Sequence, residues 1–144
     1  MQNLPHRYSV KATATTDTDV QLASSGLPSL ASAAPAEFGG PGDLWSPETL
    51  LAAAVADCFV LSFKAIARAS KFEWLTLACD AEGVLERVDR VTRFTEFQLN
   101  VVLSVPSGTD EKRARLLLEK AEQSCLITNS LNARCHLELA IESG

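Results

Sequence analysis

The chain has 144 residues, a formal net charge of −5, 47% hydrophobic residues and 22% charged residues. This length and mixture are typical of one globular domain with a real core, so we predict a single domain over residues 1–144. The basic residues are scattered rather than clustered, which argues against nucleic acid or an anionic membrane as the main partner.

Targeting signals are not evident in the sequence. No apolar run approaches the ~20 residues that cross a bilayer. The amino-terminal segment MQNLPHRYSVKA lacks the apolar core of a secretory signal. We therefore expect a cytoplasmic protein, in which cysteines are more often buried, metal-binding or catalytic than joined in structural disulfides. There are four of them: Cys58, Cys79, Cys125 and Cys135.

The first 45 residues carry weak strand signals. Residues 8–15 alternate apolar and polar side chains, which predicts a strand with Tyr8 and Val10 on a buried face. A second short strand is predicted near residues 20–22. The remainder of residues 16–45 is rich in Ala, Ser, Pro and Gly and is typical of a loop.

A long helix is the clearest element of the sequence. Ser46 is suited to cap it, Pro47 fits its first position, and Glu48 places a negative charge at the positive end of the helix dipole. Residues 47–69 contain no glycine and no further proline, and nearly every face of the helix is apolar. We expect this helix to be central and buried almost all round.

The second half of the chain alternates strands with a helix. Residues 75–82 and 94–105 have the alternating pattern of two antiparallel strands with one wet face. A helix is predicted from about Asp110, with a stripe of apolar residues that ends at Cys125. Residues 133–142 again alternate as a strand. The order ββ-α-ββ-α-β predicts an α+β fold with helices on one face of a mainly antiparallel sheet.

The four cysteines fall into two groups. Cys79 and Cys135 lie on the apolar face of predicted strands and are interpreted as small buried hydrophobes. Cys58 and Cys125 lie on the inward stripes of the two long helices. Their pattern is compatible with plain core packing or with a pair of reactive thiols, and sequence alone does not bring the two sulfurs together.

Other site chemistries find little support. The histidines are His6 and His136, there is no Cys-x-x-Cys or His-x-x-x-His, and adjacent Cys135 and His136 point to opposite faces of a strand. The nucleophile elbow Gly-x-Ser-x-Gly of many hydrolases is absent. Residues 39–42, Gly-Gly-Pro-Gly, lack the lysine of a phosphate-binding loop. We expect no metal and no cofactor.

Two cysteine-containing runs are similar to a known family. SPETLLAAAVADCF (46–59) and EKAEQSCLITNSL (119–131) resemble the paired motifs of the OsmC/Ohr family, the osmotically inducible and organic hydroperoxide resistance proteins. The resemblance covers nearly the whole chain. It implies an intertwined homodimer with a curved sheet from both chains and two long central helices. It also implies a thiol-dependent peroxidase that reduces organic hydroperoxides, and hydrogen peroxide more weakly, and is recycled by an external dithiol.

The resemblance also implies roles for individual residues. By position, Cys58 resembles the peroxidatic cysteine, Cys125 the resolving cysteine, and Glu48 the acidic residue that holds an activating arginine. The chain departs from the family here, because no arginine or lysine occurs between Lys11 and Lys64. The departure resembles the broader OsmC-like branch. Substitute cations are Arg7, Arg87, Arg90 and Arg93, or an arginine of a partner chain.

Two points stay open at the level of sequence. Apolar residues such as Val55, Phe59 and Phe38 either line a pocket that favours organic peroxides or belong to the core. The alternative function is a dimeric binding protein of the same fold that is non-catalytic or senses oxidation through its cysteines. Thiol reactivity separates the two functions, since a cysteine needs a lowered pKa to act as a nucleophile at neutral pH.

Overall fold

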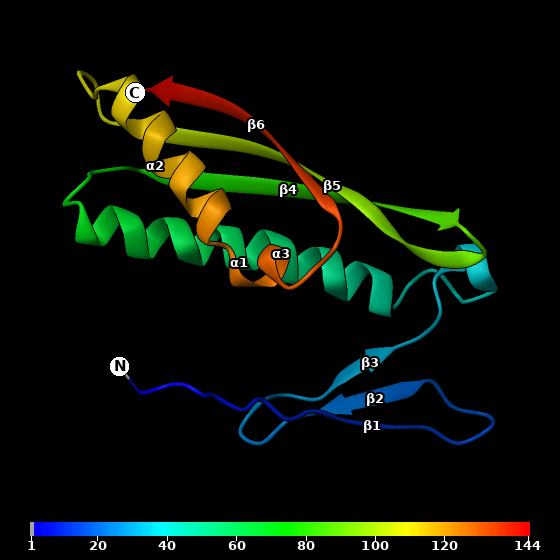
Figure 1. Ribbon diagram of the computed structural model, residues 1–144. Coiled ribbons are helices and arrows are strands. Elements are labelled where there is room, and N and C mark those ends of the chain that lie inside the picture. Colours follow the sequence, from blue (N-terminus) through cyan, green and yellow to red (C-terminus); the bar gives the residue numbers. More distant parts are fainter. Residues whose placement is uncertain (1) are drawn as a thin grey trace. The chain divides into compact units, whose positions relative to one another are not determined.

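The structure, a computed structural model, describes residues 2–144 (Figure 1). The chain forms two compact units that divide between Leu50 and Leu51. Helix α1 (Pro47–Ala69) begins in the first unit and continues into the second. The single-domain assignment of the whole chain stays a prediction.

The amino-terminal unit contains a small antiparallel sheet of order β1-β2-β3. The predicted strand at 8–15 shortens to three residues, and its buried face is wrong: Tyr8 and Val10 are 87% and 68% exposed. A sheet of three such short strands is too small to bury an apolar face without packing against another element. The third strand was missed inside the predicted loop. The elements are β1 (Lys11–Thr13), β2 (Val20–Ala23), β3 (Leu30–Ser32) and the 3₁₀ helix η1 (Ala36–Phe38).

The start of α1 follows the prediction. The Ser46 hydroxyl accepts a hydrogen bond from the Thr49 amide at 3.1 Å, and the Ser46 amide donates to the Thr49 hydroxyl at 2.8 Å. This reciprocal pair satisfies two backbone donors that a helix start otherwise leaves free. Pro47 occupies the first helical position, as expected.

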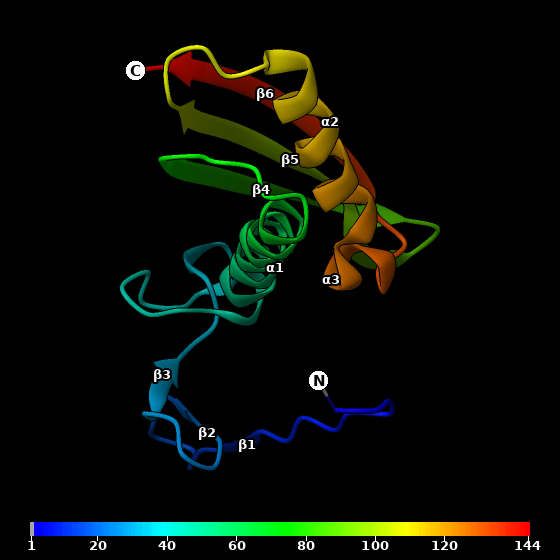
Figure 2. The same cartoon turned by 90° about the vertical axis from the view of Figure 1, so that its left-hand side faces the viewer.

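The second unit is a sheet of order β4-β5-β6 with α1 and α2 on one face (Figure 2). Strands β4 and β5 pair antiparallel, whereas β6 pairs parallel to β5 because the chain returns through α2 before it rejoins the sheet. The predicted α+β class is confirmed. The elements are β4 (Thr76–Val88), β5 (Val91–Val105), α2 (Glu111–Ser124), α3 (Leu126–Asn129) and β6 (Arg134–Ser143).

The core lies between these helices and the sheet. One stripe of α1 at four-residue spacing meets the inward residues of β5, and the predicted apolar stripe of α2 closes the layer. Asp110 caps α2 by accepting hydrogen bonds from the amides of Lys112 and Arg113. The buried set is Val55, Phe59, Phe63, Ala67, Phe72, Phe97, Leu99, Val101, Leu103, Val105, Ala114, Leu117, Leu118, Ala121 and Cys125.

The prediction that α1 is buried all round is wrong for the single chain. Leu61, on the face away from the sheet, is 56% exposed. By length and composition α1 is apolar enough to cross a membrane, which corrects the expectation of no such run, although a core helix passes the same test. Its Val55 and Phe59 are fully buried against the sheet, as in a core helix.

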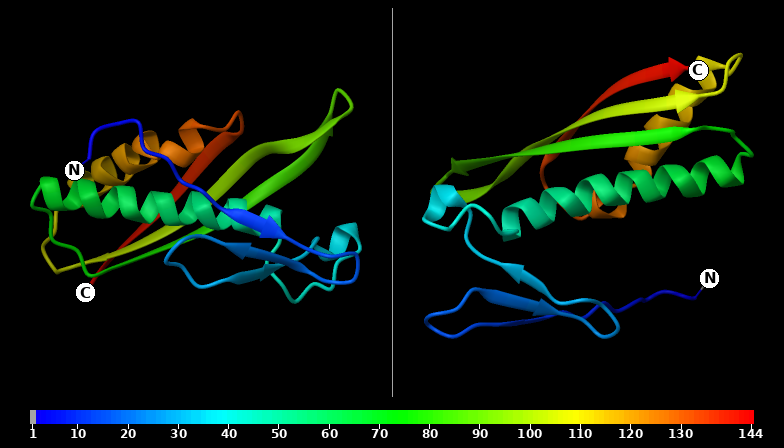
Figure 3. Two further views of the ribbon diagram at one scale, coloured as in Figure 1. Left: turned by 90° about the horizontal axis from the view of Figure 1, so that it is seen from below. Right: turned by 180° about the vertical axis from the view of Figure 1, so that it is seen from behind.

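Strands β4 and β5 form a long hairpin (Figure 3). Its two-residue turn, Asp89 and Arg90, has both residues at positive φ, 50° and 68°, as the twist of such hairpins requires. The register shifts next to Gly83, where an added Cβ would lie 2.7 Å from Phe97 and 2.9 Å from Phe94. The lack of a side chain at Gly83 therefore leaves room for the stacked rings of Phe94 and Phe97 on β5.

Candidate active site

The two candidate thiols come from different elements that pack together. Cys58 lies in the middle of α1 and is half-buried, and Cys125 is 1% exposed. Cys125 was expected on a helix, but α2 ends at Ser124 and α3 begins at Leu126. Cys125 is the residue between them, with an extended backbone (φ −66°, ψ 106°). The junction turns the chain so that α3 faces the sulfur of Cys58.

The structure brings the two sulfurs together. Hydrogen bonding between the two side chains lowers the pKa of Cys58 and raises that of Cys125, and both cysteines are reduced. The backbone amides of Leu126 and Ile127, in the first turn of α3, also donate to Cys58. The first amides of a helix have no carbonyl partner within the helix, which leaves them free for this purpose. Disulfide formation needs a close approach of this kind.

Cys58 is the thiol whose surroundings favour the charged form. Burial raises the pKa of Cys58, but the hydrogen bonds from Ile127, Cys125, Ser62 and Leu126 together outweigh it, so the pKa lies below its ordinary value. None of these principal influences is a cation. Among the described residues, hydrogen bonding to the charged form, rather than a positive neighbour, therefore lowers the pKa of Cys58.

The other three cysteines are shifted in the opposite direction. Burial raises the pKa of Cys125 above its ordinary value, and the neighbouring Cys58 adds to the rise. Burial, with a smaller effect of Asp80, raises the pKa of Cys79 to about 11. Burial and the carboxylate of Glu122 raise the pKa of Cys135 to about 12. Cys79 and Cys135 face the core from β4 and β6, in agreement with their interpretation as structural thiols.

Sequence reasoning missed the groups that surround the Cys58 sulfur. The Ser62 hydroxyl lies 3.9 Å from it, one helical turn further along α1. This spacing of four residues was the signal that would have found Ser62. The amides of Leu126 and Ile127 had no comparable signal, because only the folded chain shows that α3 points at α1.

Glu48 is not among the principal influences on Cys58. It lies ten residues earlier on α1, about 15 Å along a straight helix. Its Oε1 atom is buried and finds no hydrogen-bond partner among the residues that the structure describes. Of the candidate cations, Arg87, Arg90 and Arg93 are exposed near the turn of the β4–β5 hairpin, and Arg7 is exposed in the amino-terminal unit.

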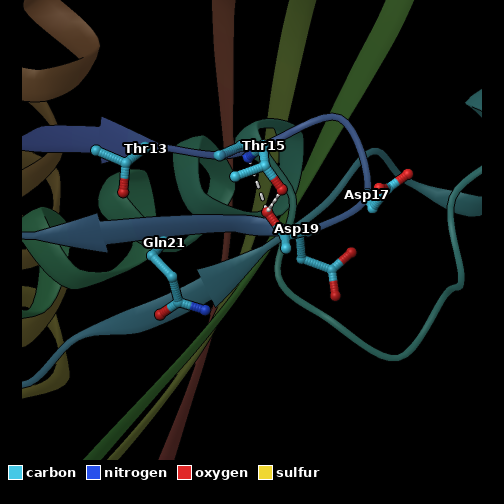
Figure 4. A pocket seen from close by; sticks show the side chains of 7 residues that line it. Thr13, Thr15, Asp17, Asp19 and Gln21 are labelled. Carbon is cyan, nitrogen blue, oxygen red and sulfur yellow. Dashed lines mark hydrogen bonds between the residues drawn. The ribbon is translucent and has the colours of Figure 1, made fainter.

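The residues proposed to line an apolar pocket differ in burial. Val55 and Phe59 are fully buried core residues, whereas Phe38 is 60% exposed. A hollow of about 560 Å³ lies at the β1–β2 hairpin, where Thr15 bonds to Thr18 and the carboxylates of Asp17 and Asp19 stand free (Figure 4). Its lining consists of threonine, alanine, aspartate and glutamine residues and contains no thiol.

Within residues 2–144, no three His, Cys, Asp or Glu side chains come close enough to hold a metal ion. Cys135 and His136 diverge as expected, since Cys135 packs against the core while His136 pairs with Glu96 on the other face at 3.4 Å.

Fold and site together describe an α+β protein built around two hydrogen-bonded thiols. Residues 40–140 match the OsmC-like protein family, and the chain belongs to this family. The family resemblance seen in the sequence is thereby confirmed.

Individual relatives agree with this assignment. The uncharacterized protein YmaD of Bacillus subtilis is 29% identical over 108 residues, which cover 73% of this chain and 72% of YmaD. An OsmC-like protein of unknown function from Vibrio cholerae has a TM-score of 0.83 at 20% identity, with 94% of this chain and 100% of that chain covered. An organic hydroperoxide resistance protein, OsmC, of Legionella pneumophila has a TM-score of 0.68 at 26% identity, covering 96% and 99%.

Proposed function

We propose that this protein is a thiol-dependent peroxidase that reduces organic hydroperoxides, and hydrogen peroxide more weakly, with Cys58 as the peroxidatic and Cys125 as the resolving cysteine. One observation carries the proposal: of the four thiols only Cys58 has a lowered pKa, and its sulfur is hydrogen-bonded to that of Cys125. Nucleophile and resolving thiol are thus in contact before any reaction.

The proposed cycle has three balanced steps. The Cys58 thiolate attacks the outer peroxide oxygen, the O–O bond breaks, and the alkoxide takes a proton to leave as an alcohol, with Cys58 oxidised to a sulfenic acid. The Cys125 thiol then condenses with the sulfenic acid, which forms the Cys58–Cys125 disulfide and releases water. An external dithiol reduces the disulfide by two exchange steps and becomes oxidised itself.

The substrate class rests on surroundings and relatives. Cys58 lies on an apolar helix, and the structurally similar Legionella protein is an organic hydroperoxide resistance protein. Both support an alkyl or aryl hydroperoxide over hydrogen peroxide. Four free cysteines are consistent with a reducing cytoplasm, where a dithiol reductant is at hand.

A homodimer is part of the proposal. The outer face of α1 exposes Leu61, and a large apolar helix face left open to water is typical of a subunit interface. Glu48 keeps its proposed role as the holder of an activating cation, since its buried Oε1 lacks a partner within the described chain. The cation would come from Arg7, Arg87, Arg90 or Arg93, of this chain or of the partner.

The test is peroxide consumption by the reduced protein with dithiothreitol, using cumene hydroperoxide and hydrogen peroxide. We expect faster turnover of cumene hydroperoxide. Cys58→Ser should lower turnover to the uncatalysed background, and Cys125→Ser should allow one turnover and then overoxidation of Cys58. The matched control is Cys79→Ala, which removes a strand thiol of raised pKa and should retain turnover. Mass spectrometry should find a Cys58–Cys125 disulfide in the oxidised wild-type protein.

The alternative is a non-catalytic or redox-sensing binding protein of the same fold. The lack of a cation among the principal influences on Cys58 favours it. Oxidation of Cys58 by peroxide without dithiol-dependent turnover would support the sensor and exclude the enzyme. Turnover that persists in Cys58→Ser would overturn the proposed mechanism altogether.

A further inference from the structure

The Ser62 hydroxyl is an unassigned polar group beside the candidate nucleophile. It lies 3.9 Å from the Cys58 sulfur, on the same face of α1, and both side chains are half-buried. The residues that flank it in this stretch of α1 are mostly apolar, and Phe59 and Phe63 are fully buried. A hydroxyl in such surroundings costs stability unless it finds a partner.

The Ser62 hydroxyl contacts a side-chain sulfur rather than the backbone. A serine inside a helix commonly donates its hydroxyl hydrogen to the backbone carbonyl four residues earlier, which would be that of Cys58. In the described chain the hydroxyl contacts the Cys58 sulfur instead. A hydroxyl both donates and accepts, so it can accept from the thiol and, after a rotation, donate to the thiolate.

We propose that Ser62 is a positioning residue that orients the Cys58 sulfur in the reduced protein and donates a hydrogen bond to it in the thiolate state. The inference rests on the proposed function, because it concerns the same nucleophile. The hydroxyl acts on the reduced enzyme, since a disulfide sulfur is a weak hydrogen-bond acceptor. Ser62 therefore assists formation and orientation of the nucleophile, and the resolving step proceeds without it.

The other groups around Cys58 define what Ser62 adds. Cys125, from the α2–α3 junction, is the titratable group hydrogen-bonded to Cys58, and Cys125 in turn helps to raise the pKa of Cys79 of β4. The amides of Leu126 and Ile127 complete the set. Ser62 is the member of this set that lies on α1 itself and that a side-chain substitution removes without changing either cysteine or the backbone of α3.

The test compares two pairs of side chains that differ in the hydroxyl. Ser62 and Ser62→Ala form one pair. Ser62→Thr and Ser62→Val form the second pair, with nearly equal shapes. The rate of Cys58 alkylation by iodoacetamide is measured against pH in the reduced full-length protein, with each cysteine resolved by peptide mass spectrometry. Alkylation of Cys79 and Cys135 in the same digests is the internal control, and circular dichroism checks the fold.

We expect Ser62→Ala and Ser62→Val to move the midpoint of Cys58 alkylation to higher pH. Their alkylation at neutral pH should be about three- to tenfold slower, the effect of one hydrogen bond of ordinary net strength. Ser62→Thr should retain the midpoint of the wild-type protein. Equal midpoints for all four side chains, or a loss in Ser62→Thr equal to that in Ser62→Val, would overturn the inference.

A parallel assay separates this inference from the proposed function. Single-turnover oxidation of Cys58 by cumene hydroperoxide should slow in Ser62→Ala and Ser62→Val by the same factor as alkylation, with disulfide formation afterwards unchanged. Suppose that alkylation of Cys58 differs between the proteins with and without the hydroxyl, but that the peroxide does not oxidise Cys58 in the wild-type protein. The peroxidase proposal then fails, while the effect of Ser62 on the thiolate stands. If oxidation occurs at equal rates in all four proteins, the role of Ser62 fails and the peroxidase remains.

Discussion

Cys58 on α1 and the two strand cysteines, Cys79 and Cys135, differ in the direction in which their pKa values are shifted. Burial raises the pKa of all four cysteines, but only Cys58 ends below its ordinary value. Cys58 accepts several hydrogen bonds, whereas Cys79 and Cys135 have Asp80 and Glu122 as acidic neighbours. Hydrogen-bond donors outweigh burial at Cys58, whereas acidic neighbours add to the effect of burial at Cys79 and Cys135.

Secondary structure explains where such donors are found. Cys79 and Cys135 lie on β4 and β6, the two strands that flank β5. Strand amides point along the plane of the sheet, whereas side chains stand roughly perpendicular to it, so the amides of a strand are not aimed at its own thiol. The first turn of α3 has amides without carbonyl partners, and the extended backbone at Cys125 aims them at Cys58. The break between α2 and α3 thus leaves backbone amides free to donate to Cys58, whereas in a continuous helix these amides would donate to carbonyls within the helix.

The largest expected effect is the difference in alkylation rate between Cys58 and the two strand cysteines, Cys79 and Cys135. At pH 8 the thiolate fraction of Cys79, with its pKa of about 11, is about one in a thousand, and that of Cys135 is lower still. Iodoacetamide should modify Cys58 more than about a hundredfold faster than either strand thiol. Peptide-resolved alkylation of the reduced, folded protein measures this difference. Comparable rates for Cys58 and Cys79 would remove the distinction between Cys58 and the strand cysteines.

A substitution in the sheet should disturb the surroundings of the strand cysteines and leave Cys58 unchanged. Gly83→Ala places a Cβ against Phe97 and Phe94, and Phe97 pairs with Cys135 across the sheet. We expect the free energy of unfolding to fall by about 1–3 kcal/mol, as for other overpacked cores. Urea titration measures this change.

The matched control relieves the same clash. Gly83→Ala combined with Phe94→Leu should lose less stability than the sum of the two single variants. The pH midpoint of Cys58 alkylation should stay where it is in all three proteins. A shift of that midpoint would show that Cys58 is coupled to the packing of the sheet.

The buried strand thiols also predict a loss of stability in alkali. The pKa of Cys79 is raised from its ordinary value of 9.0 to about 11, so the unfolded chain releases this proton at a lower pH than the folded chain. The contribution is complete below pH 9 and is lost as the pH rises towards 11. Because Cys79 is only partly buried, we expect a loss of about 1 kcal/mol.

Cys79→Ala should remove this dependence. Urea unfolding at pH 8 and pH 10.5 would show a smaller drop in the variant than in the wild-type protein, while lysine and tyrosine titration affects both equally. Parallel drops in the two proteins would mean that Cys79 is not held as a neutral thiol in the fold.

The sequence predicted the helices and strands of the second unit better than it predicted the contacts between them. Alternation and helical spacing located β4, β5, β6, α1 and α2, because these elements bury one face against a common core. The parallel direction of β6, the missed strand β3 and the uncovered face of α1 depend on contacts between distant segments. Cys58 and Cys125 came from the family resemblance. Ser62 and the amides of α3 required the fold, since their role exists only where α3 meets α1.

The smallest expected effect concerns Glu122 and Cys135. The thiol of Cys135 is hydrogen-bonded to the Glu122 carboxylate, whose negative charge opposes ionisation. Glu122→Gln removes the charge and keeps the size, so the pKa of Cys135 should fall. Alkylation of Cys135 near pH 9.5 should become about three- to tenfold faster, with Cys58 unchanged as the internal reference. An unchanged rate for Cys135 would show that burial alone suppresses this thiol, and that acidic neighbours do not contribute to the difference between strand and helix.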